Sequence, residues 1–146
     1  CPGSSLLPDS RAKLGPPMED LTTDPEIPGR EIAVAAEALY LANLMLIPGL
    51  GFVALLALWW QQRRKAPALA RGHLRQTLAA SVWAGVLLVL ANGLILLAGG
   101  YGAASTWVVV ILYFTVCHST LIFCGAIGLA RALAGKPFRF PLIGPR

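Results

Sequence analysis

The side chains of this sequence that could carry chemistry gather first in the stretch "TVCHSTLIFC", residues 115–124. Cys117 and Cys124 are seven residues apart, which on a helix places them on one face but roughly 10 Å apart along the axis. That separation is too long for a disulfide or for one shared metal ion. His118 could be an axial ligand to a haem or chlorin. We favour the alternative, a hydrogen bond across a helix interface, and predict no cofactor.

Three other polar side chains, Glu37, Asn43 and Asn92, interrupt apolar sequence. Glu37 could relay protons or pair with a partner subunit, but we favour a carboxylate that snorkels to the membrane surface. Glu37 and Asn43 lie six residues apart and therefore about 120° apart around a helix. The chain has no glycine-rich phosphate loop, no pair of membrane or loop carboxylates, and no nucleophile beside a base. We therefore predict that it is not an enzyme.

The elements that must position these side chains are predicted from composition. Hydrophobic residues make up 56% of the 146 residues and charged residues 13%, with a mean hydropathy of +0.66. Apolar runs cover residues 32–60, 76–98 and 106–133, and each is long enough to cross about 30 Å of hydrocarbon as a helix. The pattern predicts an all-α membrane protein whose domain, residues 32–146, has three transmembrane helices. Pro48 and Gly49 should kink the first of them.

The distribution of charge predicts an orientation. The loop at residues 61–75 holds five cations and no anion, and the tail at residues 134–146 is also basic. Residues 1–31 hold three cations and six acidic residues. Because Lys and Arg favour the cytoplasmic side, we place the loop and the tail inside, the N-terminus outside, and the chain in a bacterial cytoplasmic (inner) membrane. Trp59 and Trp60 should mark the inner interface. The cations should meet anionic lipids rather than nucleic acid.

Residues 1–31 form a different kind of segment. They include six of the eleven prolines, which prevent helix and central strand alike. We expect an extended segment held by a partner outside the cytoplasm. Alone, such a segment buries too little apolar surface to offset the conformational entropy that it loses on becoming ordered. Its first residue is Cys1. Either Cys1 carries diacylglycerol, as in a bacterial lipoprotein, or the sequence begins at an arbitrary point.

Two separated sets of residues resemble a known family. The first is a proline-glycine span ending in Trp, followed by a short charged loop with a proline and a His-x-Lys/Arg-Gln/Glu element; the second is a closing Gly-Lys-x-Tyr/Phe-Arg-Tyr/Phe-Pro. The matching residues are Pro48, Gly49, Trp59, Pro67, His73, Arg75, Gln76, Gly135, Lys136, Phe138, Arg139, Phe140 and Pro141. They resemble small bacterial membrane proteins of a domain of unknown function, related to the chloroplast translocon subunit Tic-twenty. The resemblance implies a fold and a cytoplasmic place for both sets rather than an activity.

These observations lead to three hypotheses of function. The first is a non-catalytic accessory subunit of a larger integral-membrane complex, such as a bioenergetic one, in which the spans contact other membrane subunits. The second is a transport or translocation component, in which Glu37, Asn43, Asn92 and His118 would face one aqueous path. The third is a cofactor-binding helix bundle that uses His118. In all three, His73, Gln76 and Arg139 could form a polar cluster at the inner interface.

Overall fold

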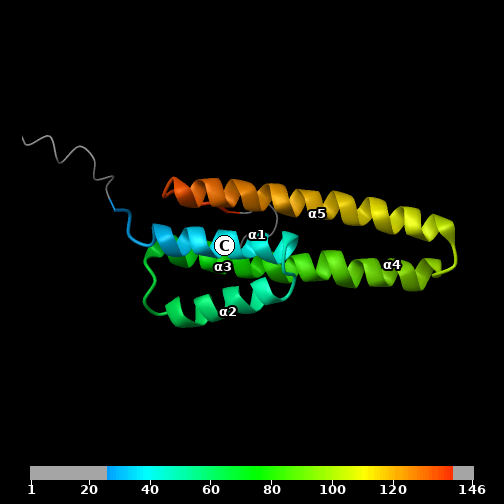
Figure 1. Ribbon diagram of the computed structural model, residues 1–146, viewed down its shortest axis with the longest axis horizontal. Coiled ribbons are helices and arrows are strands. Elements are labelled where there is room, and N and C mark those ends of the chain that lie inside the picture. Colours follow the sequence, from blue (N-terminus) through cyan, green and yellow to red (C-terminus); the bar gives the residue numbers. More distant parts are fainter. Residues whose placement is uncertain (1–25, 140–146) are drawn as a thin grey trace, which may run out of the picture.

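The computed structural model describes residues 26–139, and in that part every regular element is helical. The elements are α1 (Arg30–Met45), α2 (Leu50–Gln62), α3 (Ala68–Gly85), the π-helical turn η2 (Val86–Leu90), α4 (Ala91–Gly99) and α5 (Ala104–Leu133). Helix α3 runs through η2 into α4 as one rod, and α5 lies alongside it (Figure 1). The predictions for Cys1, for most of residues 1–31, for Phe140 and for Pro141 lie outside the described residues.

Two helices are long and apolar enough to cross a membrane: Ala68–Gly99 and Ala104–Leu133. They correspond to the predicted spans 76–98 and 106–133. The first begins earlier than predicted, because the chain enters α3 directly after Pro67, at the N-cap position. Residues 68–75, predicted as loop, therefore form helix. The basic side chains of this segment are exposed while Ala70, His73 and Leu74 are buried, so its first turns are amphipathic.

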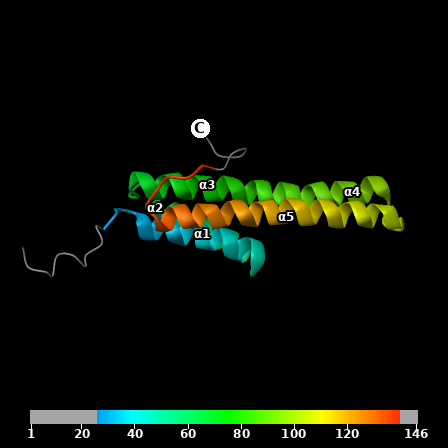
Figure 2. The same ribbon diagram turned by 90° about the horizontal axis from the view of Figure 1, so that it is seen from above.

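The predicted single span at residues 32–60 is wrong. The chain ends α1 at Met45 and reverses direction (Figures 1 and 2). It returns as α2, which packs against both α1 and α3 (Figure 1). These helices have 16 and 13 residues, fewer than the roughly 20 that a helix needs to cross the hydrocarbon. The two together form a helical hairpin that does not reach the far end of the bundle.

The reversal has a local cause at residues 46–49. Pro48 cannot continue a helix, and Gly49 adopts φ 89°, a conformation that favours glycine. The Asn43 carboxamide oxygen accepts hydrogen bonds from the backbone N–H groups of Gly49, at 2.9 Å, and Phe52, at 3.0 Å. One side chain of α1 thereby satisfies donors at the start of α2.

Small residues let the helices approach closely around α1. Ala33, Ala36 and Ala70 are fully buried, together with Tyr40 and Leu55. Tyr40 reaches across to α5, where its hydroxyl donates to the Leu121 carbonyl at 3.3 Å. Helix α1 packs against α2, α3 and α5 at once, so it forms the centre of the four-helix part of the bundle.

The start of α1, the loop before α3 and the end of α5 lie together at one end of the bundle (Figure 1). Gly29 lies against Pro67 and Ala70, and Gly135 lies against Ile27. The predicted separation of residue 31 from the basic loop by a membrane does not fit this arrangement, because the hairpin brings the chain back to the end from which it started. The turn between α4 and α5 lies at the opposite end.

Candidate functional site

A buried carboxyl and imidazole meet where α1, α3 and the segment after α5 converge. Glu37 Oε1 lies 2.7 Å from His73 Nδ1, and the side chains are 0% and 1% exposed. The other ring nitrogen, Nε2, lies 3.1 Å from the Lys136 carbonyl oxygen. A carbonyl only accepts hydrogen bonds, so Nε2 carries a proton. The Glu37–His73 hydrogen bond then needs one further proton, held either by the carboxyl or by the imidazole.

The surroundings of this pair fix its geometry. A Cβ atom at Gly128, on α5, would lie 2.6 Å from Glu37 Oε2, so only glycine leaves room for the carboxyl. Thr77 donates its hydroxyl hydrogen to the His73 carbonyl at 2.9 Å. Burial raises the pKa of the Glu37 carboxyl above its usual value, while the hydrogen bond and charge of His73, and then the nearby Gln76 side chain, act against that rise. The pair is therefore a proton-holding contact between α1, α3 and the chain after α5.

Glu37 lies inside the bundle and not at the membrane surface predicted for it. The prediction of a snorkelling carboxylate is wrong, because Glu37 has no exposed surface and faces His73. Two signals in the sequence pointed to the pair: Glu37 is the only acidic residue after residue 31, and His73 is one of only two histidines. Their separation of 36 residues hid the contact, since only the reversal at Pro48 brings α1 beside α3.

The structure places the other residues of the predicted polar cluster around this pair. Gln76 is 3% exposed, and its side chain acts on the pKa of the neighbouring Glu37 carboxyl. Arg75 and Arg139 line a pocket together with His73 and Gln76, and Lys136 takes part through its backbone carbonyl.

The predicted aromatic pair lies at the end of α2. The rings of Trp59 and Trp60 meet edge to face with centroids 6.5 Å apart. The Arg63 guanidinium lies 4.0 Å from the Trp60 ring centroid and 5.6 Å from that of Trp59, within the range of cation–π attraction. Trp60 is 63% exposed. This arrangement suits a membrane interface, where an aromatic ring meets hydrocarbon on one side and cations on the other.

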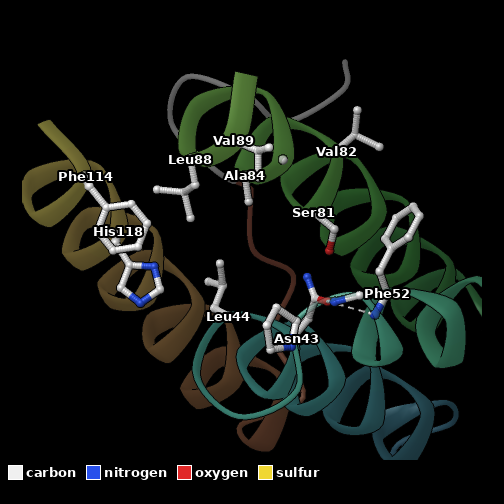
Figure 3. A pocket seen from close by; sticks show the side chains of 13 residues that line it. Asn43, Leu44, Phe52, Ser81, Val82, Ala84, Leu88, Val89, Phe114 and His118 are labelled. Carbon is white, nitrogen blue, oxygen red and sulfur yellow. Dashed lines mark hydrogen bonds between the residues drawn. The ribbon is translucent and has the colours of Figure 1, made fainter. Parts of the chain in front are cut away.

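A pocket of about 550 Å³ lies under the reversal, midway along the two long helices (Figure 3). Asn43 and Leu44 line it from α1, Phe52 from α2, Ser81 and Val82 from α3, Leu88 from η2, and Phe114 and His118 from α5. The His118 ring stacks on Phe114, with centroids 5.1 Å apart and an interplanar angle of 15°.

The predicted intramembrane polar residues do not share one path. Asn43 and His118 line the pocket, whereas Glu37 lies in the pair with His73. Asn92 donates its amide hydrogen to the Leu88 carbonyl of its own helix at 2.8 Å. The arrangement that a transport path requires is thus absent from residues 26–139. Within the same residues no group of three or more His, Cys, Asp or Glu side chains could hold a metal ion, and Cys117 and Cys124 are free thiols on α5.

Comparison with known proteins identifies one family. The family model described as "MamF_MmsF: Magnetosome magnetite crystal formation protein family" matches residues 30–146. That stretch begins at the first residue of α1 and includes every described helix. No curated protein and no solved structure matches the chain significantly. The match overturns the resemblance to the Tic-twenty-related proteins, whose shared residues are a proline-glycine turn, a charged loop and a basic tail.

Proposed function

Because the chain belongs to the MamF/MmsF magnetosome magnetite crystal formation protein family, we propose that it is a non-catalytic structural component of the magnetosome membrane. In this role the helix bundle acts on crystal formation by organising the membrane and its proteins around the growing crystal. Its contribution to crystal formation is then structural rather than chemical.

The buried polar side chains support this proposal, because they hold the helices together. Glu37 and His73 join α1 to α3 and to the Lys136 carbonyl, Asn43 closes the hairpin, and Tyr40 joins α1 to α5. Each of these contacts fixes one helix against another. A reaction site would instead direct such groups into an open cleft.

The outer surface supports a membrane location. The exposed side chains of α5 include Val108, Val109, Ile111, Leu112 and Val116, each more than half exposed. A soluble protein rarely exposes a continuous apolar face of this kind. We propose that α3–α4 and α5 cross the membrane, and that these faces contact lipid and other integral-membrane proteins.

We further propose an orientation in which the hairpin enters the membrane from the cytoplasmic side. The end that holds the start of α1, the loop before α3 and the end of α5 carries Arg63, Arg64, Lys65, Arg71, Arg75, Arg131, Lys136 and Arg139. Cationic segments favour the cytoplasm. The opposite end, the turn at residues 100–103, has no charged residue and would face the compartment that holds the crystal.

The structural role is tested by replacing the buried pair without keeping its chemistry. In a magnetite-forming bacterium that lacks this protein, we expect the double variant Glu37→Leu/His73→Met to restore crystal size as the unaltered chain does, because apolar residues of similar volume can replace a buried polar pair. The single variant Glu37→Leu leaves one buried ring nitrogen of His73 without a hydrogen-bond partner, which destabilises the fold. It should therefore reduce the amount of protein in isolated magnetosome membranes.

Electron microscopy of crystal size, with immunoblotting of the isolated membranes, separates the outcomes. The variant Gly93→Leu serves as a control, since a Cβ atom at Gly93 would meet nothing within 4 Å. A double variant that reaches the membrane at normal levels and yet fails to restore the crystals would contradict a structural role and favour proton chemistry at the pair.

A further inference from the structure

The pocket under the hairpin holds polar atoms that its own walls do not satisfy. Ser81 is 5% exposed, and among residues 26–139 its hydroxyl has no hydrogen-bond partner; the same is true of the buried His118 Nδ1. Both residues line the pocket, one from α3 and one from α5 (Figure 3). A buried polar group without a partner costs stability, so these two atoms indicate a ligand that brings its own polar groups.

The position of the pocket restricts the ligand to membrane-soluble compounds. Ser81 lies 13 residues from the start of the Ala68–Gly99 helix and 18 residues from its end, or roughly 20 and 27 Å at the helical rise. Because the hydrocarbon is about 30 Å thick, the pocket lies within it wherever along this helix the membrane is placed. Val82, Val89 and Phe114 on its wall are 55%, 73% and 41% exposed, so it opens sideways to the hydrocarbon.

Water and lipid chains fit this pocket poorly. Its volume of about 550 Å³ would hold on the order of 18 water molecules, each of which needs two to four polar partners, and the wall is mostly Leu, Val, Phe, Ala and Gly. An acyl chain would fill the space but would leave Ser81 and His118 unsatisfied. A phospholipid headgroup would bring charge to a site that has no charged residue in its lining.

We propose that the pocket binds the ring of an isoprenoid quinone. A planar ring would lie along the apolar wall beside the stacked Phe114 and His118 rings, and its tail would leave through the side opening. Ser81 and His118 line the pocket from different helices, so each can form a hydrogen bond with a different carbonyl oxygen of the same ring. A hydroxyl and an imidazole each donate or accept hydrogen bonds, so the same two groups suit both the quinone and the quinol.

The test uses the full chain in phosphatidylcholine nanodiscs, with decylubiquinone as the probe and decylbenzene as the carbonyl-free control. Isothermal titration should show saturable binding of decylubiquinone and none of decylbenzene. Ser81→Ala and His118→Phe each remove one hydrogen bond while keeping the shape, and should each weaken binding roughly 3- to 10-fold. Their infrared spectra should show one quinone carbonyl stretch restored toward its free frequency.

Matched variants separate the pocket from the rest of the helix. Gly85 lines the pocket, and a Cβ atom there would meet nothing within 4 Å, so Gly85→Leu should extend into the open space of the site and abolish binding. Gly93→Leu and Ser119→Ala lie outside the pocket lining and should bind as the unaltered chain does. The proposal would be overturned if the Ser81 and His118 variants bound decylubiquinone as tightly as the unaltered chain does. It would also be overturned if decylbenzene bound as tightly as decylubiquinone, or if no saturable binding were seen. If Gly85→Leu fails to fold, the Ser81 and His118 variants still decide it.

Discussion

The Glu37–His73 contact places a titratable carboxyl on a surface that α1 shares with α3 and α5. His73 faces it from α3, Tyr40 lies one turn along α1, and Gly128 faces it from α5 without a side chain. Since Nε2 of His73 donates to the Lys136 carbonyl, the contact with Glu37 needs a proton of its own. Any change that removes this proton or its acceptor therefore acts on three helices at once.

The raised pKa of Glu37 predicts that stability depends on pH. A carboxyl whose pKa is higher in the folded than in the unfolded chain, where it is 4.5, binds its proton more tightly when folded. The thermal unfolding midpoint should therefore be highest below about pH 4.5 and fall as pH rises through the folded-state pKa. Circular dichroism of the chain in detergent micelles at a series of pH values measures this slope.

Glu37→Gln is the matching control. The amide N–H can donate to His73 Nδ1 as a protonated carboxyl does, so the hydrogen bond stays while the titration is lost. We expect this variant to lack the part of the pH slope that Glu37 contributes. An identical slope in both chains would show that other groups set the pH dependence.

At the scale of elements, the hairpin explains why the first apolar run does not behave like the others. Length and hydropathy predict a span for residues 32–60 as they do for 76–98 and 106–133. A proline followed by glycine is compatible with either a kink or a reversal. The reversal depends on the Asn43 side chain, which caps the start of α2, and on room for α2 against α1 and α3, which depends on tertiary packing.

Gly51 tests the packing of the hairpin. A Cβ atom there would lie 2.7 Å from the Asn43 Cα atom, and backbone cannot move aside as a side chain end can. Gly51→Ala should therefore lower the free energy of unfolding by about 1–3 kcal/mol, the usual cost of overpacking. Gly93→Ala, where the added methyl group meets nothing, should be neutral or slightly stabilising because alanine favours helix. Denaturation of both variants in the same detergent measures these free energies of unfolding. An equal loss in the two variants would contradict close contact between α1 and α2.

At the scale of the whole molecule, the bundle changes thickness along its length. Helices α1, α2, α3 and α5 pack together in the part of the bundle that holds the Glu37–His73 pair, whereas only α4 and α5 extend beyond the hairpin turn (Figures 1 and 2). The two long helices and the lack of charge between them follow from the sequence, because apolar length and charge are properties of single segments. The common end shared by α1, the basic loop and the tail does not follow from it, since it depends on where the first run reverses.

This arrangement predicts a specific pattern of chemical accessibility. With the native cysteines replaced by serine, single cysteines are introduced at Glu31, Arg64 and Lys136, at Gly102, and at Ile47 in the reversal. A membrane-impermeant maleimide applied to sealed vesicles of known orientation should label the first three from the same side and residue 102 only from the other. Residue 47 should be poorly labelled from either side, because the hairpin turn lies at the depth of the hydrocarbon. Labelling of residue 31 from the side of residue 102 would mean that the first apolar run crosses the membrane after all, and that the bundle rearranges when it inserts.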